Sequence, residues 1–302
     1  MKLQFDTFTP FATQAVGGPL VANASSETGR LTDVVLCPPH YLAPVPCCAV
    51  TRESLASGFA LKADRAKQQH AALVRVLREN GVACHMLEPK AGLPDMCFTR
   101  DIAVATPFGL RLLNPAMPHR KGEAVALART CREWGISVDP VDSGTIEGGD
   151  VCVARPGLLL VGTSGERTVP AAVESFAAPF RAAGWNVLVC PFHADHLHLD
   201  TIFCMVSPYE AIACIDLLDR DFVTQVEAQG IRILPVSPQM AATLGCNILS
   251  LGERHIIASE GSTEVITLLR DAGYRVTEVD VSEFTACGGG IHCLTMPLCR
   301  KG

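Results

Sequence analysis

The chain has 302 residues, of which 48% are hydrophobic and 19% are charged, and its formal net charge is -6. This length and composition suffice to bury a large core, as one big domain or as two ordinary ones. The acidic balance and the lack of a Lys/Arg run argue against a nucleic-acid binder. No apolar stretch reaches the roughly 18 residues of a membrane span, so we expect no membrane partner.

The chain contains 14 cysteines. A disulfide framework would need an oxidising compartment, but residues 1–30 lack the regions of a secretory signal peptide. We therefore expect reduced, mostly buried thiols in a cytoplasmic protein. The number of cysteines by itself nominates no functional site.

The first segments of the chain fit no repeat. We expect residues 1–32 to form an N-terminal extension that is partly flexible. Residues 37–50 (CPPHYLAPVPCCAV) are rich in proline and suit a loop or lid over a site.

One pattern then recurs five times: an amphipathic helix, a glycine, and an apolar or β-branched strand. The helices are predicted over 64–79, 121–133, 169–183, 218–228 and 262–272. The glycines that follow are Gly81, Gly135, Gly184, Gly230 and Gly273. Each suits the left-handed backbone just past a helix end. Their spacing of 43 to 54 residues indicates one supersecondary unit used repeatedly.

Further strand-like runs lie between the helices, so that each unit combines a helix with a small sheet of about three strands. These runs are 101–107, 109–115, 151–162, 201–207, 210–216, 247–259 and 292–298. Five such units closed in a ring would bury their sheet edges and aim loops at a central channel. We therefore predict the α/β class, as a five-fold pseudo-symmetric α/β propeller in a single domain of residues 33–302. An open doubly wound sheet is the alternative, and hairpin-like strand pairs favour the ring.

Four polar clusters fall at predicted strand ends or turns of different units. They contain Arg100 and Asp101; Glu147 and Asp150; His196, His198 and Asp200; and His292 and Cys293. The three residues of the third cluster share one face if that stretch is a strand, because side chains alternate along a strand.

A glycine run, 288–290, leads directly into His292 and Cys293. Glycines let a backbone turn tightly and approach a ligand closely. A cysteine that follows such a bend and enters a strand can be held at the mouth of a pocket as a nucleophile. A plain glycine-rich turn with a buried thiol is the alternative.

Asp101, Glu147 and Asp200 would all face the centre of the ring, where carboxylates repel one another unless a cation lies among them. A metal ion is one candidate, because residues 192–200 (FHADHLHLD) are rich in histidine and aspartate, although their spacing is not diagnostic. An organic guanidinium is the other, since it pairs bidentately with carboxylates. A guanidino carbon also needs a strong nucleophile and a general acid, which would account for a nearby Cys and His.

The motifs FTRD (98–101), EGGD (147–150), HLD (198–200) and GGGIHC (288–293), on a five-fold repeat, resemble the guanidino-group-modifying enzymes. These are arginine deiminase, dimethylarginine dimethylaminohydrolase and the amidinotransferases, which share the pentein propeller fold. The resemblance runs from about residue 33 to 300. It implies a catalytic domain that needs no metal or organic cofactor and whose partner is a small guanidino compound.

The resemblance assigns roles to individual positions. Cys293 becomes the nucleophile, His198 the general acid and base, and Glu147 a group that orients the substrate and assists proton transfer. The implied substrate-binding residues are Asp101 and Asp200 at the guanidinium, Arg120 and Arg167 at the α-carboxylate, and Phe98. Attack by the thiolate would give a covalent S-alkylthiouronium intermediate, and water would then release a ureido product.

The branches of the family differ in ways that bear on the substrate. Arginine deiminases tend to have one residue fewer between the glycine run and the cysteine, so the additional Ile291 makes this motif more similar to that of the amidinotransferases. The compact length and the motif RKGE (120–123) resemble the dimethylarginine hydrolases instead. The latter typically lack the carboxylate found here at Asp200, which favours an unmethylated guanidinium. Asp101, where arginine dihydrolases carry asparagine, favours a reaction that stops at the ureido product.

The leading hypothesis is therefore a hydrolase of arginine or a close analogue. The alternatives are a dimethylarginine dimethylaminohydrolase, an amidinotransferase, a metal-dependent hydrolase that uses residues 192–200, and a non-catalytic binder of cationic amino acids. The sequence leaves open the length and N-substitution of the substrate. It also leaves open the oligomeric state, a homo-oligomer included.

Overall fold

The computed structural model describes residues 20–141 and 143–302. Their strands form five three-stranded sheets of one design. In each sheet the middle strand pairs antiparallel with one neighbour and parallel with the other, and a helix precedes the parallel strand. The predicted α/β propeller with five-fold pseudo-symmetry in a single domain is confirmed.

The five units follow one another along the chain. The first holds β1 (Arg30–Leu36), α2 (Ala63–Glu79) and β2 (Ala83–Met86) and is completed by β15 (Met296–Lys301). The second holds β3 (Ala103–Thr106), β4 (Gly109–Leu112), α3 (Lys121–Glu133) and β5 (Val138–Pro140). The third holds β6 (Val151–Arg155), β7 (Leu158–Thr163), α4 (Pro170–Ala182) and β8 (Asn186–Pro191).

The fourth unit holds β9 (Phe203–Ser207), β10 (Glu210–Ala213), α5 (Arg220–Ala228) and β11 (Arg232–Pro235). The fifth holds β12 (Leu249–Gly252), β13 (His255–Ser259), α7 (Thr263–Asp271) and β14 (Arg275–Val279). Three short helices lie outside this scheme: α1 (Ala49–Ala56), α6 (Pro238–Ala242) and α8 (Ser282–Thr285). No helix in the described part of the chain is both long and apolar enough to cross a membrane.

The five predicted helices form within two residues of their expected ends. The glycine after each has a positive φ of 73° to 83°, which confirms the left-handed helix endings. Each helix buries one face; α2, for example, buries Ala66, Leu73 and Leu77. The 14 cysteines are free thiols and most are buried.

Two sequence-based expectations differ from the structure at the chain ends. The predicted boundary after residue 32 falls inside β1, and Asn23 already bridges to Cys299 of β15. The predicted strand 292–298 begins only at Met296, so Cys293 lies in a turn before the strand. Residues 1–19 of the expected extension lie outside the described residues.

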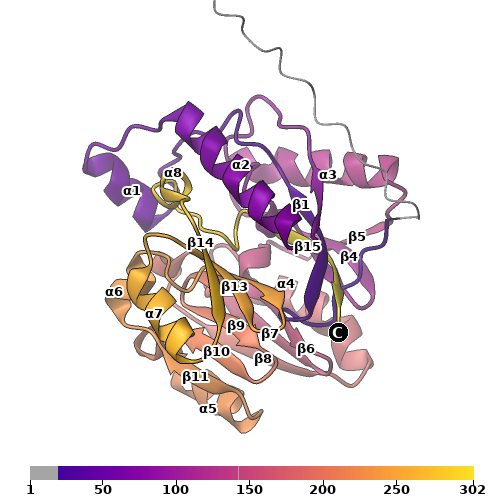
Figure 1. The fold of residues 1–302 in the computed structure, drawn as a ribbon. Coiled ribbons are helices and arrows are strands. Elements are labelled where there is room, and N and C mark those ends of the chain that lie inside the picture. The colour runs from indigo at the N-terminus through magenta and orange to yellow at the C-terminus, as the bar shows by residue number, and fades with distance from the viewer. Residues whose placement is uncertain (1–19, 142) are drawn as a thin grey trace, which may run out of the picture.

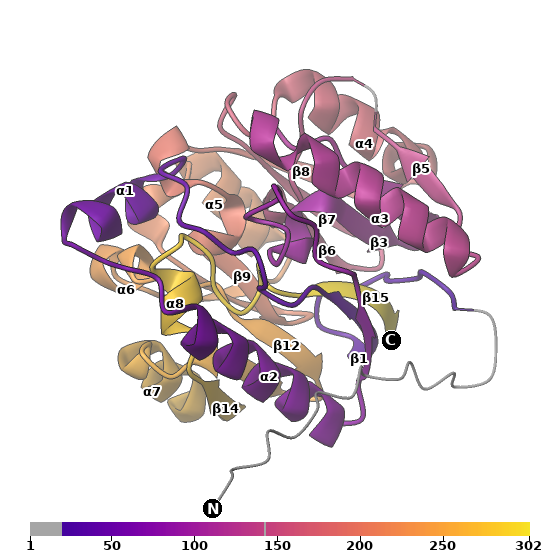
Figure 2. The ribbon, with the colours of Figure 1, turned by 90° about the horizontal axis from the view of Figure 1, so that it is seen from above.

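The strands β3, β6, β9, β12 and β15 form the inner wall of the ring, where β15 contacts β3, β6 contacts β9, and β9 contacts β12. Figure 1 shows α3, α5, α6 and α7 at the periphery and β6, β7, β9 and β13 nearer the centre. In Figure 2, β1 and β15 lie side by side, which joins the two ends of the chain in one sheet. The turns that precede the inner strands therefore meet near one end of the central axis.

Candidate active site

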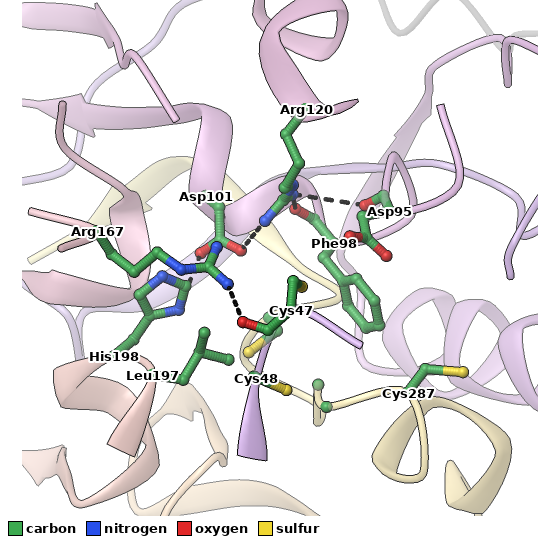
Figure 3. A pocket seen from close by; sticks show the side chains of 13 residues that line it. Cys47, Cys48, Asp95, Phe98, Asp101, Arg120, Arg167, Leu197, His198 and Cys287 are labelled. Atoms are coloured by element: carbon green, nitrogen blue, oxygen red, sulfur yellow. Dashed lines mark hydrogen bonds and ion pairs between the residues drawn. The ribbon is translucent and has the colours of Figure 1, made fainter. Parts of the chain in front are cut away.

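A narrow pocket lies where these turns meet. Its free volume is about 30 Å3, so a substrate of the size of arginine enters only if lining side chains move. It is lined by Cys47, Cys48, Asp95, Phe98, Asp101, Arg120, Arg167, Leu197, His198, Cys287, Gly288, Gly289 and Cys293 (Figure 3). Cys293 and His198 form its deep end, at 2% and 1% exposure, whereas Cys47 is only half-buried.

Cys293 is fixed at two points by Asn247, which precedes β12. The Asn247 Nδ2 atom donates to the Cys293 Sγ atom at 3.1 Å, and its Oδ1 atom accepts from the Cys293 backbone N–H at 3.2 Å. Gly290 makes room for this amide, because a Cβ atom there would lie 2.6 Å from Asn247 Oδ1. Burial, with the charges of Asp200 and Asp101, raises the pKa of the Cys293 thiol well above its ordinary value. In the ligand-free protein this group is therefore a thiol.

His198 lies against Glu147 at the deep end. Its Nε2 atom is 2.6 Å from Glu147 Oε2, and its Nδ1 atom is 3.6 Å from Asp101 Oδ1. Burial favours the neutral ring, but Asp101 and the hydrogen bond to Glu147 outweigh burial and raise the pKa of His198 to about 10. His198 is thus an imidazolium at neutral pH, ready to act as a proton donor.

Glu147 is fully buried and stays ionised. Burial alone would raise its pKa, but His198, Arg167 and Arg120 together hold the pKa below its usual range. Glu147 Oε2 lies 3.3 Å from Arg167 Nη1, and Oε1 accepts from the backbone N–H of Ala116 at 2.8 Å. The carboxylate therefore orients His198 from a fixed position.

The stretch from His196 to Asp200 is not a strand, so the condition under which its three polar side chains would share one face is not met. It forms two 3-10 turns, Ala194–His196 and Leu199–Thr201, joined at Leu197, whose φ is 58°. The left-handed residue reverses the chain, so His196 stays partly exposed while His198 and Asp200 are buried in the site.

Asp200 lies beside the nucleophile. Its Oδ2 atom is 3.6 Å from Cys293 Sγ and 2.8 Å from His292 Nδ1, while its buried Oδ1 atom has no hydrogen-bond partner among the described residues. Burial would raise the pKa of Asp200, but His292, His198 and Arg100 outweigh burial and lower it. The ionised carboxylate beside the thiol therefore has one oxygen, Oδ1, that lacks a donor among the described residues.

The two predicted carboxylate-binding arginines differ in how far they are engaged. Arg120 donates to Asp101 Oδ2 at 2.6 Å, to Glu123 Oε2 at 2.8 and 3.0 Å, and to the Phe98 carbonyl at 3.0 Å. Arg167 bridges Glu147 and the Cys47 carbonyl, which it reaches at 2.9 Å (Figure 3). Of the two, Arg167 retains more N–H groups for a ligand. Through it, the predicted loop 37–50 closes over the pocket.

Phe98 also lines the pocket, as its place among the predicted substrate-binding residues requires. Its ring meets that of Phe284 edge to face, with centroids 6.4 Å apart. This contact gives the pocket one apolar wall, suited to the methylene chain of a long cationic side chain.

Two groups of three metal-type ligands occur among the described residues: Asp101, Glu147 and His198, and Cys47, Asp95 and His119. In the first, both carboxylates are already paired with arginines. His193, Asp195 and His196 belong to neither group, because the turns around Leu197 point them away from the pocket, and the first two are exposed. The run 192–200 therefore does not converge on one point.

Sequence reasoning missed two residues that support the site, Asn247 and Glu27, and gave no role to a third, Asp150. Asn247 holds Cys293, Glu27 lies 3.1 Å from His292 Nε2, and Asp150 accepts from the Leu199 N–H at 2.8 Å, next to His198. The repeat offered a signal for Asn247, because it precedes an inner strand in the same way as Asp101 and Asp200. No local signal marks Glu27.

Comparisons with known proteins identify the family. Residues 51–300 match the family model of eukaryotic N,N dimethylarginine dimethylhydrolase. The chain is 30% identical over 275 residues to YkgA of Bacillus subtilis, covering 91% of this chain and 94% of that protein. It is 28% identical over 250 residues to the N(G),N(G)-dimethylarginine dimethylaminohydrolase of Streptomyces coelicolor, covering 82% and 90%.

A solved structure shares the fold: a substrate-bound cysteine-to-serine mutant of the N-terminal domain of ArgZ, a cyanobacterial arginine dihydrolase. Its TM-score is 0.79 at 22% identity, covering 89% of this chain and 98% of that one. The family match, the five-fold ring and the Cys, His and Glu at its axis lead to one conclusion. The chain belongs to the N,N-dimethylarginine dimethylhydrolase family, within the pentein superfamily of guanidino-modifying enzymes, and is a hydrolase that acts on guanidino groups.

Proposed function

We propose that this hydrolase acts on the unmethylated guanidino group of arginine or a close analogue, through a covalent intermediate on Cys293. The products are a ureido compound, citrulline when arginine is the substrate, and ammonia. One observation carries the choice of substrate: Asp200, whose Oδ2 atom lies 3.6 Å from Cys293 Sγ, has a second buried oxygen, Oδ1, with no hydrogen-bond partner among the described residues.

A planar guanidinium supplies the missing donors, because each terminal NH2 group carries two N–H bonds. A dimethylated terminal nitrogen carries none, and its methyl groups would desolvate the Asp200 carboxylate without a hydrogen bond. With that nitrogen turned toward Asp200, binding of a dimethylated substrate is expected to be weaker by about 1–3 kcal/mol.

The first half of the reaction forms the intermediate. The bound cation favours the Cys293 thiolate, and the thiol proton is released to solvent as the substrate binds. The sulfur attacks the guanidino carbon, forming a C–S bond. As the C–N bond to one terminal nitrogen breaks, the His198 imidazolium donates its proton to the departing NH2 group. Ammonia leaves, and a cationic S-alkylthiouronium remains on Cys293.

The second half of the reaction hydrolyses the intermediate and regenerates the free enzyme. Neutral His198 takes a proton from water, and the resulting hydroxide attacks the thiouronium carbon. The C–S bond then breaks and the Cys293 thiolate leaves, and loss of the hydroxyl proton to solvent gives the ureido product. A proton from solvent returns to the Cys293 sulfur when the product departs, and the ammonia released in the first half takes up a proton in solution. Glu147, Asp101 and Asp200 stabilise the cationic states from fixed positions.

The family match supports a second candidate, the hydrolysis of methylated arginines. In that reaction the departing group is methylamine or dimethylamine in place of ammonia. A panel of arginine, mono- and dimethylarginines, agmatine and guanidino acids, assayed for ureido product and released amine, separates the two. We expect the highest kcat/KM with an unmethylated compound. A preference for dimethylarginine would overturn the proposed substrate but leave the covalent chemistry intact.

The covalent step has its own test. Cys293→Ser is expected to lower ureido product formation by at least about 10³-fold, because the hydroxyl is far less nucleophilic than a thiolate. Cys287→Ser, at another lining thiol, serves as the matched control. Retained turnover in Cys293→Ser would contradict the mechanism. Ornithine production with an added amine would instead identify an amidinotransferase.

A further inference from the structure

A second cluster of reactive side chains lies at the outer end of the pocket. Its members come from three separate segments: Cys47 from the loop before α1, Asp95 from the loop after β2, and His119 from the 3-10 turn Pro118–Arg120. One ligand atom of each lies within 4.8 Å of the other two, and Asp95 Oδ2 is 2.7 Å from His119 Nε2.

We infer that Cys47, Asp95 and His119 form a binding site for a thiophilic divalent cation of the zinc type, which closes the pocket to substrate. A thiolate, an imidazole and a carboxylate are the donors that zinc takes in proteins. Tetrahedral coordination would bring the three atoms to roughly 3.3–3.8 Å from one another, given bond lengths of about 2.0–2.3 Å. The cluster therefore contracts only slightly around the ion.

The charges around the cluster permit a cation. Arg167 lies beside Cys47, but its guanidinium is paired with Glu147 at 3.3 Å. Arg120 is paired with Asp101 at 2.6 Å and with Glu123 at 2.8 Å. Both arginines are thus neutralised by carboxylates deeper in the protein. A Cys47 thiolate and the Asp95 carboxylate then balance a divalent ion.

The position of the cluster means that a bound ion would block entry of the substrate. Cys47 and Asp95 line the pocket, while His119 is 24% exposed and contacts Asp95 at 2.7 Å. The three protein ligands leave a fourth position for water, and an ion with its water would fill the entrance to a cavity of about 30 Å3. Figure 3 shows Cys47 near the middle of the lining side chains, with Arg167 on its left, Asp95 on its right and Arg120 above. Bound cation and guanidino substrate therefore exclude each other.

Cobalt(II), which takes zinc sites and absorbs light, tests the site by equilibrium binding. Titration of the full chain is expected to give one equivalent with a thiolate-to-cobalt charge-transfer band, displaced by zinc. Cys47→Ser should abolish the band, and His119→Gln should weaken cobalt binding at least about tenfold. Cys48→Ser, which changes the neighbouring lining thiol, and Cys293→Ser should both keep the band.

If Cys293→Ser lost the band and Cys47→Ser kept it, the ion would be bound by Cys293 and not by Cys47. That result would overturn the inference. Absence of stoichiometric binding in the unaltered chain would also overturn it. Zinc should inhibit competitively with the guanidino substrate. This inhibition test rests on the proposed function. The cobalt band does not depend on the proposed function. A wrong substrate and an absent metal site would therefore give different results.

Discussion

The reactivity of Cys293 is set by the few side chains that touch it. Asn247 orients the sulfur and caps the backbone N–H of the same residue, while Asp200 stands 3.6 Å from the sulfur and discourages its ionisation. A thiol held in this way is unreactive until a cation arrives. In the proposed mechanism, substrate binding and activation of Cys293 are one event, which would protect the cysteine from side reactions in the empty site.

Asn247→Ala removes both contacts to Cys293. We expect kcat to fall about 10- to 100-fold, because a hydrogen bond to a charged sulfur is worth about 1.5–3 kcal/mol. Steady-state kinetics measures this, and thermal unfolding monitors the fold. Asn186→Ala, at an exposed asparagine, is the control and should leave kcat unchanged. An unaltered kcat in Asn247→Ala would show that the amide does not orient the sulfur.

The raised pKa of His198 makes stability depend on pH. The folded-state pKa of about 10 exceeds the ordinary value of 6.5, so folding favours the charged ring. This contribution is fully present below pH 6.5 and is lost as pH rises through about 10. The difference in unfolding free energy between the unaltered chain and His198→Gln should therefore shrink between neutral pH and pH 10. Urea unfolding at several pH values measures it, and a constant difference would contradict the assigned charge.

At the scale of elements, the decisive pieces are the turns that precede the inner strands. The turns before β3, β6, β9, β12 and β15 present, in order, Asp101, Glu147, His198 with Asp200, Asn247 and Cys293. Each unit thus contributes to one site from the same structural position. The turns pack against one another directly, so small residues decide whether they fit.

Gly149 is the clearest case, because a Cβ atom there would lie 2.7 Å from His198 Nδ1. Gly149→Ala is expected to displace the imidazole from Glu147, to lower kcat at least about tenfold, and to cost about 1–3 kcal/mol of stability through overpacking. Gly261→Ala is the matched control, since its nearest neighbour would be 3.9 Å away. Equal activity of the two variants would mean that His198 tolerates a shifted position.

At the scale of the whole molecule, both chain ends close the ring. Residues 23–31 run beside β15, and Glu27 reaches the interior, where Arg100, Arg300 and His292 lie 3.2, 3.8 and 3.1 Å from its carboxylate. His292 in turn contacts Asp200. The N-terminal segment therefore balances the charges behind Asp200.

Glu27→Gln leaves Arg100 and Arg300 without their counter-charge. Breaking a buried ion pair costs about 3–5 kcal/mol, and we expect a loss of stability of that order in urea unfolding. Substrate turnover should also fall, because His292 loses one of its two carboxylate partners. Glu79→Gln, at a carboxylate 66% exposed on α2, should change stability by less than about 0.5 kcal/mol. A Glu27 variant as stable as this control would refute the role of the segment.

The five-fold repeat could be predicted from the sequence alone. Amphipathic helices, their terminal glycines and the spacing between them are local patterns, so five units and a ring followed without knowledge of contacts. The polar motifs named Cys293, His198, Glu147, Asp101 and Asp200, because each cluster stands beside a strand that the pattern marks. In the structure Cys293, His198 and Asp101 line one pocket, and Glu147 and Asp200 lie against His198 and Cys293.

Features that depend on contacts between residues far apart in the chain could be seen only in the folded structure. The pairing of β1 with β15 places Glu27 in the interior, and the left-handed turn at Leu197 separates His196 from His198. The engagement of Arg120 by Asp101 and Glu123, and the free oxygen of Asp200, follow from three-dimensional packing. No local pattern encodes contacts between distant partners such as Glu27 and His292, which are 265 residues apart in the chain.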